Sequence, residues 1–186
     1  MLELLVAQSA IIHTCEDTKL ASQCTTTQIG EAVITAFHCV RRCTPEDLRY
    51  SVDLDIIILK EGPVTDADCL DAAVGDKVTA SGWPNTGYEQ MSGEIKKVIN
   101  THRIVDGENV GYKLIYDVDF SILGGYSGGP LTLDSTGRTV GMNYAGGLFG
   151  TSSLTVSTAC AFIRGEYDEL NKKLQSDSKK VIQPTE

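Results

Sequence analysis

The sequence predicts an all-β protein, a barrel or a sandwich, that ends in one α-helix. Short segments rich in Val, Ile, Thr and Tyr recur along most of the chain, with Gly, Asp, Asn or Pro between them. No helical pattern separates these segments, which argues against the βαβ units of a parallel sheet. One apolar stripe with helical spacing stands near the C-terminal end.

The strand-like segments begin near the start of the chain and continue almost to the helix. They span residues 4–12, 32–37, 55–59, 77–83, 93–99, 112–118, 130–133 and 139–144. The letters STGRT between the last two segments predict a hairpin turn.

The helical stripe repeats at i, i+4, i+7 and i+11. Its members are Ile163, Tyr167, Leu170 and Leu174. Acidic residues stand early in this stretch and Lys172 and Lys173 stand late, the distribution that the helix dipole favours. We therefore expect a helix over residues 161–175 and a polar, frayed tail over residues 176–186.

Composition argues against a nucleic-acid-binding protein and against a membrane protein. The chain has 186 residues and a net charge of −9, and its basic clusters are pairs too short to form a phosphate-binding stripe. No apolar run approaches the ~18 residues that a membrane helix needs. We therefore expect neither a nucleic-acid nor a membrane partner, and the length suits one domain or two small lobes.

Six cysteines are many for a cytosolic chain of this length, and an even number favours pairing. No pair or cluster has the spacing of a zinc site, so disulfides are expected in preference to a metal, and no cofactor is implied. The compartment would then be extracellular or otherwise oxidising. The start, MLELLVAQSAII, is a poor secretion signal because it lacks a basic leader. Buried free thiols in an intracellular or viral protein are the alternative.

The motif GGYSGGP, residues 124–130, places Ser127 in a glycine-rich loop. Acyl transfer by serine needs a hydroxyl, an imidazole that accepts its proton, and a carboxylate that orients the imidazole. It also needs backbone amides that converge on an oxyanion. Alone, such a loop could be a surface turn.

Two further motifs supply the other groups. His38 ends the apolar run AVITAFHC, and Asp55 opens DIIIL. Taken singly, His38 fits a partly buried structural histidine, and the neighbouring Asp53 competes with Asp55 for the same role.

Together, TAFHC, DIIIL and GYSGGP resemble TAAHC, DIAL and GDSGGP of the trypsin-like (chymotrypsin-fold) serine peptidases, in the same order. The resemblance covers about residues 7–174. It implies two antiparallel six-stranded Greek-key β-barrels packed together, with a C-terminal α-helix. The N-terminal barrel, residues 1–70, would carry His and Asp, and the C-terminal barrel, residues 71–160, would carry Ser and the specificity pocket.

The resemblance also implies roles for single residues. His38 would be the general base, Asp55 its orienting partner and Ser127 the nucleophile of an endopeptidase that acts through an acyl-enzyme. The amides of Gly125 and Ser127 would form the oxyanion hole. A glycine at position 125 suits an amide that must point inward through a conformation a Cβ would hinder.

The same resemblance places a primary specificity pocket near Ser127. Ser121 would form its floor, so no buried charge would await a Lys or Arg side chain, and cleavage after small or medium uncharged residues is expected. Asn143 leaves room for Gln or Glu recognition. The remaining walls would be Ile122, Tyr144, Ala145, Gly146 and Leu154.

Two cysteine pairs match disulfides of the family. Cys24 and Cys39 would fasten the histidine loop, and Cys69 and Cys160 would tie the crossing between barrels to the start of the C-terminal helix. Cys15 and Cys43 are left over.

Tyr126 departs from the family pattern. Many members have an aspartate there, which pairs with a freed N-terminus during activation. A neutral phenol cannot neutralise a buried ammonium, so we expect a loop that is ordered without N-terminal insertion, with Tyr126 packed or hydrogen-bonded within the second barrel.

The leading hypothesis is therefore a monomeric serine endopeptidase acting on proteins or peptides. Two alternatives stay open: a catalytically silent binding module with the same fold, and a protease that processes a viral polyprotein.

Overall fold

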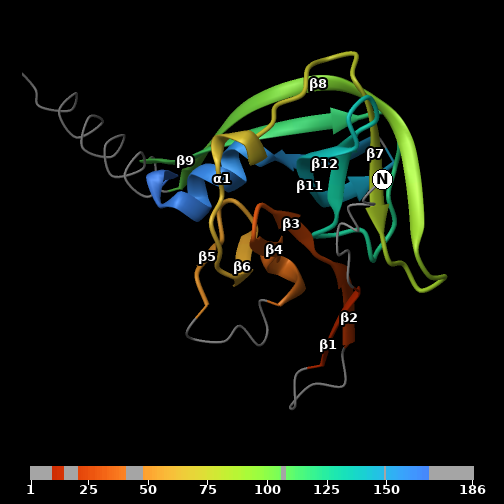
Figure 1. Cartoon of the computed structure of the whole chain (residues 1–186), viewed down its shortest axis with the longest axis horizontal. Helices are drawn as coiled ribbons and strands as arrows, with labels where there is room; N and C mark the ends of the chain where they lie inside the picture. Colours follow the sequence, from red (N-terminus) through yellow and green to blue (C-terminus); the bar gives the residue numbers. More distant parts are fainter. Residues whose placement is uncertain (1–9, 15–20, 41–47, 106–107, 149, 168–186) are drawn as a thin grey trace, which may run out of the picture.

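The computed structural model describes residues 10–14, 21–40, 48–105, 108–148 and 150–167. These residues form two β-rich halves and one helix (Figure 1). The fold is mostly β, as the sequence predicts, and the STGRT turn joins two antiparallel strands as expected.

The C-terminal half is a closed antiparallel barrel of six strands in the order β10-β11-β12-β9-β8-β7. Short side chains and bulky aliphatic ones alternate into its interior, which is filled by Val78, Ala80, Ile95, Tyr116, Val118, Leu131 and Val140, among others. The strands are β7 (Lys77–Gly82), β8 (Glu89–Val105), β9 (Glu108–Val118), β10 (Pro130–Leu133), β11 (Arg138–Gly147) and β12 (Gly150–Thr155).

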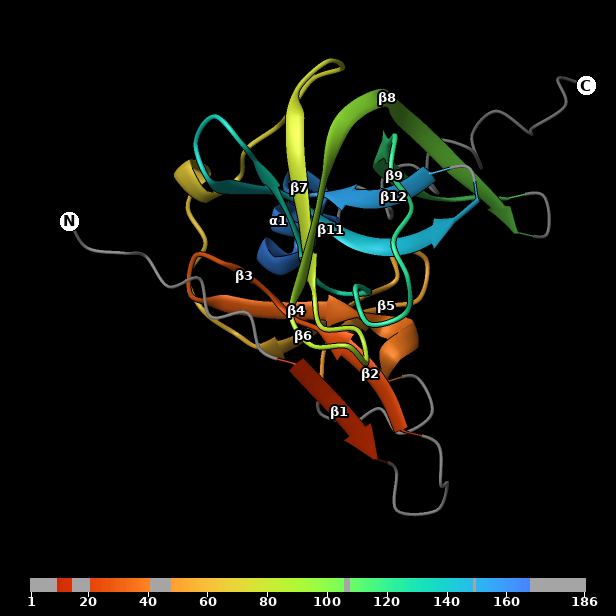
Figure 2. The ribbon, with the colours of Figure 1, turned by 90° about the vertical axis from the view of Figure 1, so that its right-hand side faces the viewer.

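The N-terminal half also has six strands, but in the described residues they do not close into one barrel. They form a four-stranded sheet, β3-β4-β6-β5, and a separate β1–β2 hairpin that extends away from the molecule (Figure 2). Strands β2 and β3 are separated by Thr26, and the residues on either side of it bond to the C-terminal half instead. The elements are β1 (Ala10–Thr14), β2 (Ala21–Thr25), β3 (Thr27–Ile29), β4 (Ala32–Ala36), the short helix η1 (Phe37–Cys39), β5 (Tyr50–Ser51) and β6 (Ile56–Lys60).

One core cluster joins the two halves. Ile34, Ile56, Ile57 and Ile58 of the first half share it with Met142 and Leu154 of the barrel and with the C-terminal helix. Each fully buried side chain of this size stabilises the fold by about 1.5–3 kcal/mol. The two halves are therefore packed as one unit.

The C-terminal helix α1 (Val156–Arg164) begins five residues before the start expected from the apolar stripe, which corrects that boundary. Thr155 is its N-cap, because its side chain accepts a hydrogen bond from the Thr158 amide at 3.3 Å. Gly165 ends it in the left-handed conformation, with φ 84°. Residues 166 and 167 are helical again, and residues 168–186, including the expected tail, lie outside the described part.

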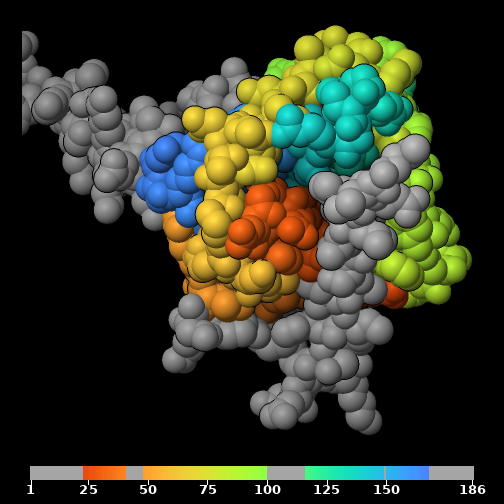
Figure 3. Space-filling view, in the orientation of Figure 1, coloured from red at the N-terminus to blue at the C-terminus, as the bar shows by residue number. Residues whose placement is uncertain are grey.

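The crossing between the halves runs over the surface beside α1 (Figure 3). It spans residues 61–76 and contains the short helix η2 (Asp66–Asp68). The Cys69–Cys160 disulfide fastens it to α1, with Cα atoms 6.0 Å apart. The Ala72 amide donates to the Tyr116 hydroxyl at 2.7 Å, which attaches the crossing to the barrel.

Both disulfides that the resemblance implied are confirmed, since Cys24 and Cys39 are also joined. They indicate an oxidising compartment. Cys15 and Cys43 lie outside the described residues. Among the described helices, none has the length and apolar character needed to cross a membrane.

Candidate active site

His38 and Asp55 form a hydrogen-bonded pair at the edge of the first sheet. The His38 Nδ1 lies 2.6 Å from Asp55 Oδ2. The backbone amide of His38 also donates to Asp55 Oδ1 at 2.8 Å. Both carboxylate oxygens of Asp55 are thus directed at His38, which fixes the ring and leaves Nε2 available on its other side. The neighbouring Asp53 is exposed and makes neither of these bonds.

The backbone around this pair explains why it forms. Strand β4 ends at Ala36, and η1 then presents His38 while Cys39 turns inward. Asp55 precedes β6 with a φ of 54°, and it is the one residue other than glycine with positive φ in the described chain. Such a conformation costs on the order of 1 kcal/mol, and strain of this kind is often found at functional sites.

The loop that carries Ser127 is held against the first half by hydrogen bonds across the seam between them. The Thr25 amide donates to the Ser127 carbonyl at 2.8 Å. The Thr27 hydroxyl donates to the Gly128 carbonyl at 2.7 Å. This seam places Ser127 beside the segment that leads to His38.

Gly128 allows this close approach. Its φ is 81°, and a Cβ at this position would lie 2.0 Å from Thr35 Oγ1 and 3.0 Å from the Ala36 amide. No side chain fits there. In the described chain no hydrogen bond joins His38 to the Ser127 hydroxyl, and such bonds often tighten only when substrate binds.

Gly125 has a backbone conformation and surroundings that admit only glycine. Its φ is 101°, and a Cβ would lie 2.5 Å from the Trp83 carbonyl oxygen. Its carbonyl accepts bonds from the Thr25 hydroxyl at 2.7 Å and from the Trp83 amide at 3.3 Å. Among the described residues, the amides of Gly125 and Ser127 donate to no protein group, which leaves both for a ligand oxygen.

Tyr126 is fully buried in the barrel. Its hydroxyl donates to Glu89 Oε2 at 3.4 Å. Burial first, and then the charge of Glu89, raise the pKa of the phenol above its ordinary value, so it remains protonated. The structure thus shows for Tyr126 the packing and the hydrogen bond within the second barrel that the sequence led us to expect.

Two of the segments expected to form a specificity pocket contact each other. The Ser121 hydroxyl donates to the Gly147 carbonyl, and a Cβ on Gly146 would lie 2.6 Å from Ile122. The segment 121–122 therefore meets the end of β11, where Ala145 and Gly146 are exposed.

The other three expected pocket residues are Asn143, Leu154 and Tyr144. Asn143 is fully buried, donates to the Pro130 carbonyl at 3.2 Å and accepts from Ser153 at 2.7 Å. Leu154 is fully buried in the core that joins the halves. Both side chains are thus enclosed by protein. Tyr144 is half-buried and packs against the core that joins the halves, and burial first, with the charges of Asp55 and Asp117 contributing, raises its pKa.

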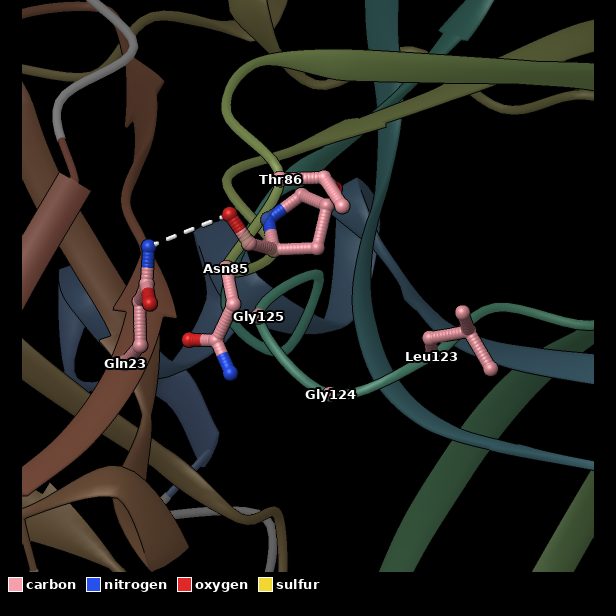
Figure 4. Close-up of a pocket in the computed structure, with 7 residues that line it drawn as sticks. Gln23, Asn85, Thr86, Leu123, Gly124 and Gly125 are labelled. Atoms are coloured by element: carbon pink, nitrogen blue, oxygen red, sulfur yellow. Dashed lines mark hydrogen bonds between the residues drawn. The ribbon is translucent and has the colours of Figure 1, made fainter.

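A cavity of about 610 Å³ borders Gly125 (Figure 4). It is bounded by Gln23, by residues 84–86 and by residues 123–125. The Gln23 side chain donates to the Pro84 carbonyl at 3.3 Å, so the cavity lies between the two halves. Sequence reasoning did not find Gln23, Asn85 or Thr86, because no motif links these positions.

The donor atoms of Cys24, Cys39 and His38 lie within 4.8 Å of one another. The two sulfurs are bonded to each other, however, so they are not free to coordinate a metal ion.

No model of a known protein family matches this chain, and no curated protein matches it. Solved structures do match. The active form of the Rv3671c protease from M. tuberculosis is 21% identical, with a TM-score of 0.63 over 78% of this chain and 74% of that one. The HtrA-type protease AlgW, solved with a decapeptide, is 14% identical, with a TM-score of 0.58 over 84% of this chain and 61% of that one. The fold is thus that of the trypsin-like serine proteases, which confirms the fold that the three motifs led us to expect.

Proposed function

We propose that this chain is a serine endopeptidase that hydrolyses peptide bonds through an acyl-enzyme on Ser127. The proposal rests on one observation: two groups of residues lie on either side of the hydrogen-bonded contact between the halves. One is the His38–Asp55 pair with its 2.6 Å hydrogen bond, and the other is a serine loop with two unused amides. The likeness in fold to solved serine proteases supports the same reading.

In the proposed reaction, His38 Nε2 takes the proton of the Ser127 hydroxyl as its oxygen attacks the substrate carbonyl carbon. The carbonyl oxygen gains negative charge and accepts hydrogen bonds from the amides of Gly125 and Ser127. The protonated imidazole then gives its proton to the leaving amine, and the carbon–nitrogen bond breaks. A water molecule, deprotonated by His38, hydrolyses the acyl-enzyme and frees Ser127.

We propose that the loop does not need a freed N-terminus. Tyr126 stands where an acidic partner for an ammonium would be required, and it is buried as a neutral phenol. A chain with a short peptide added before Met1 should keep its activity. Loss of activity with an unchanged circular-dichroism spectrum would contradict this part of the proposal.

The proposed substrates are proteins or peptides with a small or medium uncharged residue before the cleaved bond. Ser121, Ile122, Ala145 and Gly146 supply no charge that could pair with Lys or Arg. Digestion of a peptide library, read by mass spectrometry, tests this preference. We further propose a monomer in an extracellular or other oxidising compartment, and sedimentation tests its oligomeric state.

A fluorophosphonate probe tests the central claim, because it reacts with an activated serine. The parent chain should be labelled at Ser127, and Ser127→Ala should abolish labelling. Ser135→Ala, a change at an exposed serine of the β10–β11 hairpin, is the matched control and should label normally. An unlabelled parent chain with intact fold would instead indicate a silent binding module.

A further inference from the structure

Tyr126 completes a three-residue unit with the start of the β7–β8 hairpin. Gly82 and Glu89 are directly paired across β7 and β8. The Tyr126 ring covers Gly82 so closely that a Cβ there would lie 2.7 Å from Tyr126 Cγ. The phenol then reaches Glu89 Oε2 at 3.4 Å. The Tyr126 ring thus packs on Gly82, and its hydroxyl bonds to Glu89, the residue paired with Gly82.

Glu89 is held in place from its other side. Its Oε1 accepts a hydrogen bond from the Thr86 hydroxyl, which belongs to the loop between β7 and β8. The carboxylate therefore has one oxygen for the phenol and one for the loop. Because Tyr126 stays protonated, it remains a donor to Glu89.

Few other side chains could anchor the nucleophile loop. Between Leu123 and Pro130 every residue is glycine except Tyr126 and Ser127. Leu123 is 71% exposed, so it does not fix the loop. Glycine leaves the backbone free to rotate, so the peptides on both sides of Tyr126 depend on this ring, on the bonds across the seam and on backbone bonds to Trp83 and Asn143 of the barrel.

We propose that Glu89 is a positioning residue that acts through Tyr126 to hold the amides of Gly125 and Ser127 in the orientation that binds the oxyanion. The inference rests on the proposed function. It assigns the task of ordering this loop to a buried neutral phenol and to a partly buried carboxylate at the start of β8.

The test compares Glu89→Ala, Glu89→Gln, Tyr126→Phe and the double variant Glu89→Ala/Tyr126→Phe with the parent chain. Each is assayed for the rate of fluorophosphonate labelling and for kcat and KM on a peptide found by library digestion. Glu94→Ala is the matched control, because it removes another carboxylate of β8 that pairs with Lys77 and Lys96 instead.

Loss of a hydrogen bond between a neutral donor and a carboxylate should lower the rate of the acylation step by about fivefold to tenfold. We expect Glu89→Ala and Tyr126→Phe each to lower kcat and the labelling rate by about that factor, with KM changed less than twofold. The double variant should be no slower than the slower single variant, because both remove one interaction. Glu89→Gln keeps an acceptor oxygen and should retain activity within about twofold, and Glu94→Ala should match the parent.

Several outcomes would overturn the inference alone. They are an unchanged labelling rate in Glu89→Ala, an effect confined to KM, or losses that multiply in the double variant. A merely structural role would lower the melting temperature without a selective loss of kcat, and near-UV circular dichroism with thermal melting separates the two. If the parent chain is not labelled, the proposed function fails first and this inference fails with it.

Discussion

His38 and Asp55 form a pair whose geometry is set by local contacts, whereas Ser127 stands in a glycine-rich loop whose geometry depends on partners far away in the sequence. The first pair is local, because the two residues are 17 positions apart and one carboxylate contacts both the ring and the amide of His38. The serine loop depends on partners 100 and 101 positions away, namely Thr25 and Thr27. Substitutions in the first half should therefore change the chemistry with little change in fold. Those at the seam should change both.

The largest effect is expected from Asp55→Asn. The amide cannot hold the tautomer in which His38 Nε2 accepts a proton, so kcat should fall by roughly 10⁴-fold while the melting temperature stays close to that of the parent. Asp53→Asn is the matched control and should leave kcat near that of the parent. A drop of less than tenfold for Asp55→Asn would show that another group orients the imidazole.

The second largest effect is expected from Gly128→Ala, in the serine loop. The new methyl group would meet Thr35 Oγ1 at 2.0 Å, so the seam must open. We expect a loss of about 3 kcal/mol or more in the free energy of unfolding, with loss of labelling. Gly137→Ala has a similar φ of 68° but open space, and should cost only about 1–2 kcal/mol. Urea unfolding measures both, and equal losses would show that backbone conformation alone matters.

A smaller effect is expected from Thr25→Val, which removes the hydroxyl but keeps the shape. It would leave the Gly125 carbonyl without its 2.7 Å bond and the Trp83 amide without its 3.0 Å bond to Thr25 Oγ1. The free energy of unfolding should fall by about 2–3 kcal/mol. Thr25→Ser retains the hydroxyl and should recover most of this loss. If serine is no better than valine, the hydroxyl does not fasten the halves.

The smallest effect is expected on the free energy of unfolding at alkaline pH, and it concerns the C-terminal barrel alone. Burial raises the pKa of Tyr116 to about 12. The folded state therefore keeps a proton that the unfolded chain loses near pH 10, so stability should fall between about pH 10 and 12, by less than about 3 kcal/mol. Tyr116→Phe should reduce this slope in urea titrations. An identical slope in both chains would assign the alkaline loss to other groups.

Much of the site could be predicted because His38, Asp55 and Ser127 each stand in a recognisable local motif. The choice between Asp55 and Asp53 could not be made from sequence with certainty, because it depends on a positive φ that aims the carboxylate at His38. The hydrogen bonds that Thr25 and Glu89 make with the loop were missed because these residues lie far from the loop in sequence and belong to no motif. Strand composition predicted the mostly β class and the three motifs predicted the trypsin-like fold, but the helix start was not predicted, because Thr155 caps the helix before the apolar stripe begins.

The bonds from Thr25 to Gly125 and Ser127 have a consequence for synthesis of the chain. The residues that order the serine loop are made early, and the loop itself is made late. Under the proposed mechanism, a growing chain that has made His38 and Asp55 still lacks Ser127, and a barrel folded alone would hold Ser127 without His38. The proposed activity would therefore require both halves to be folded and docked.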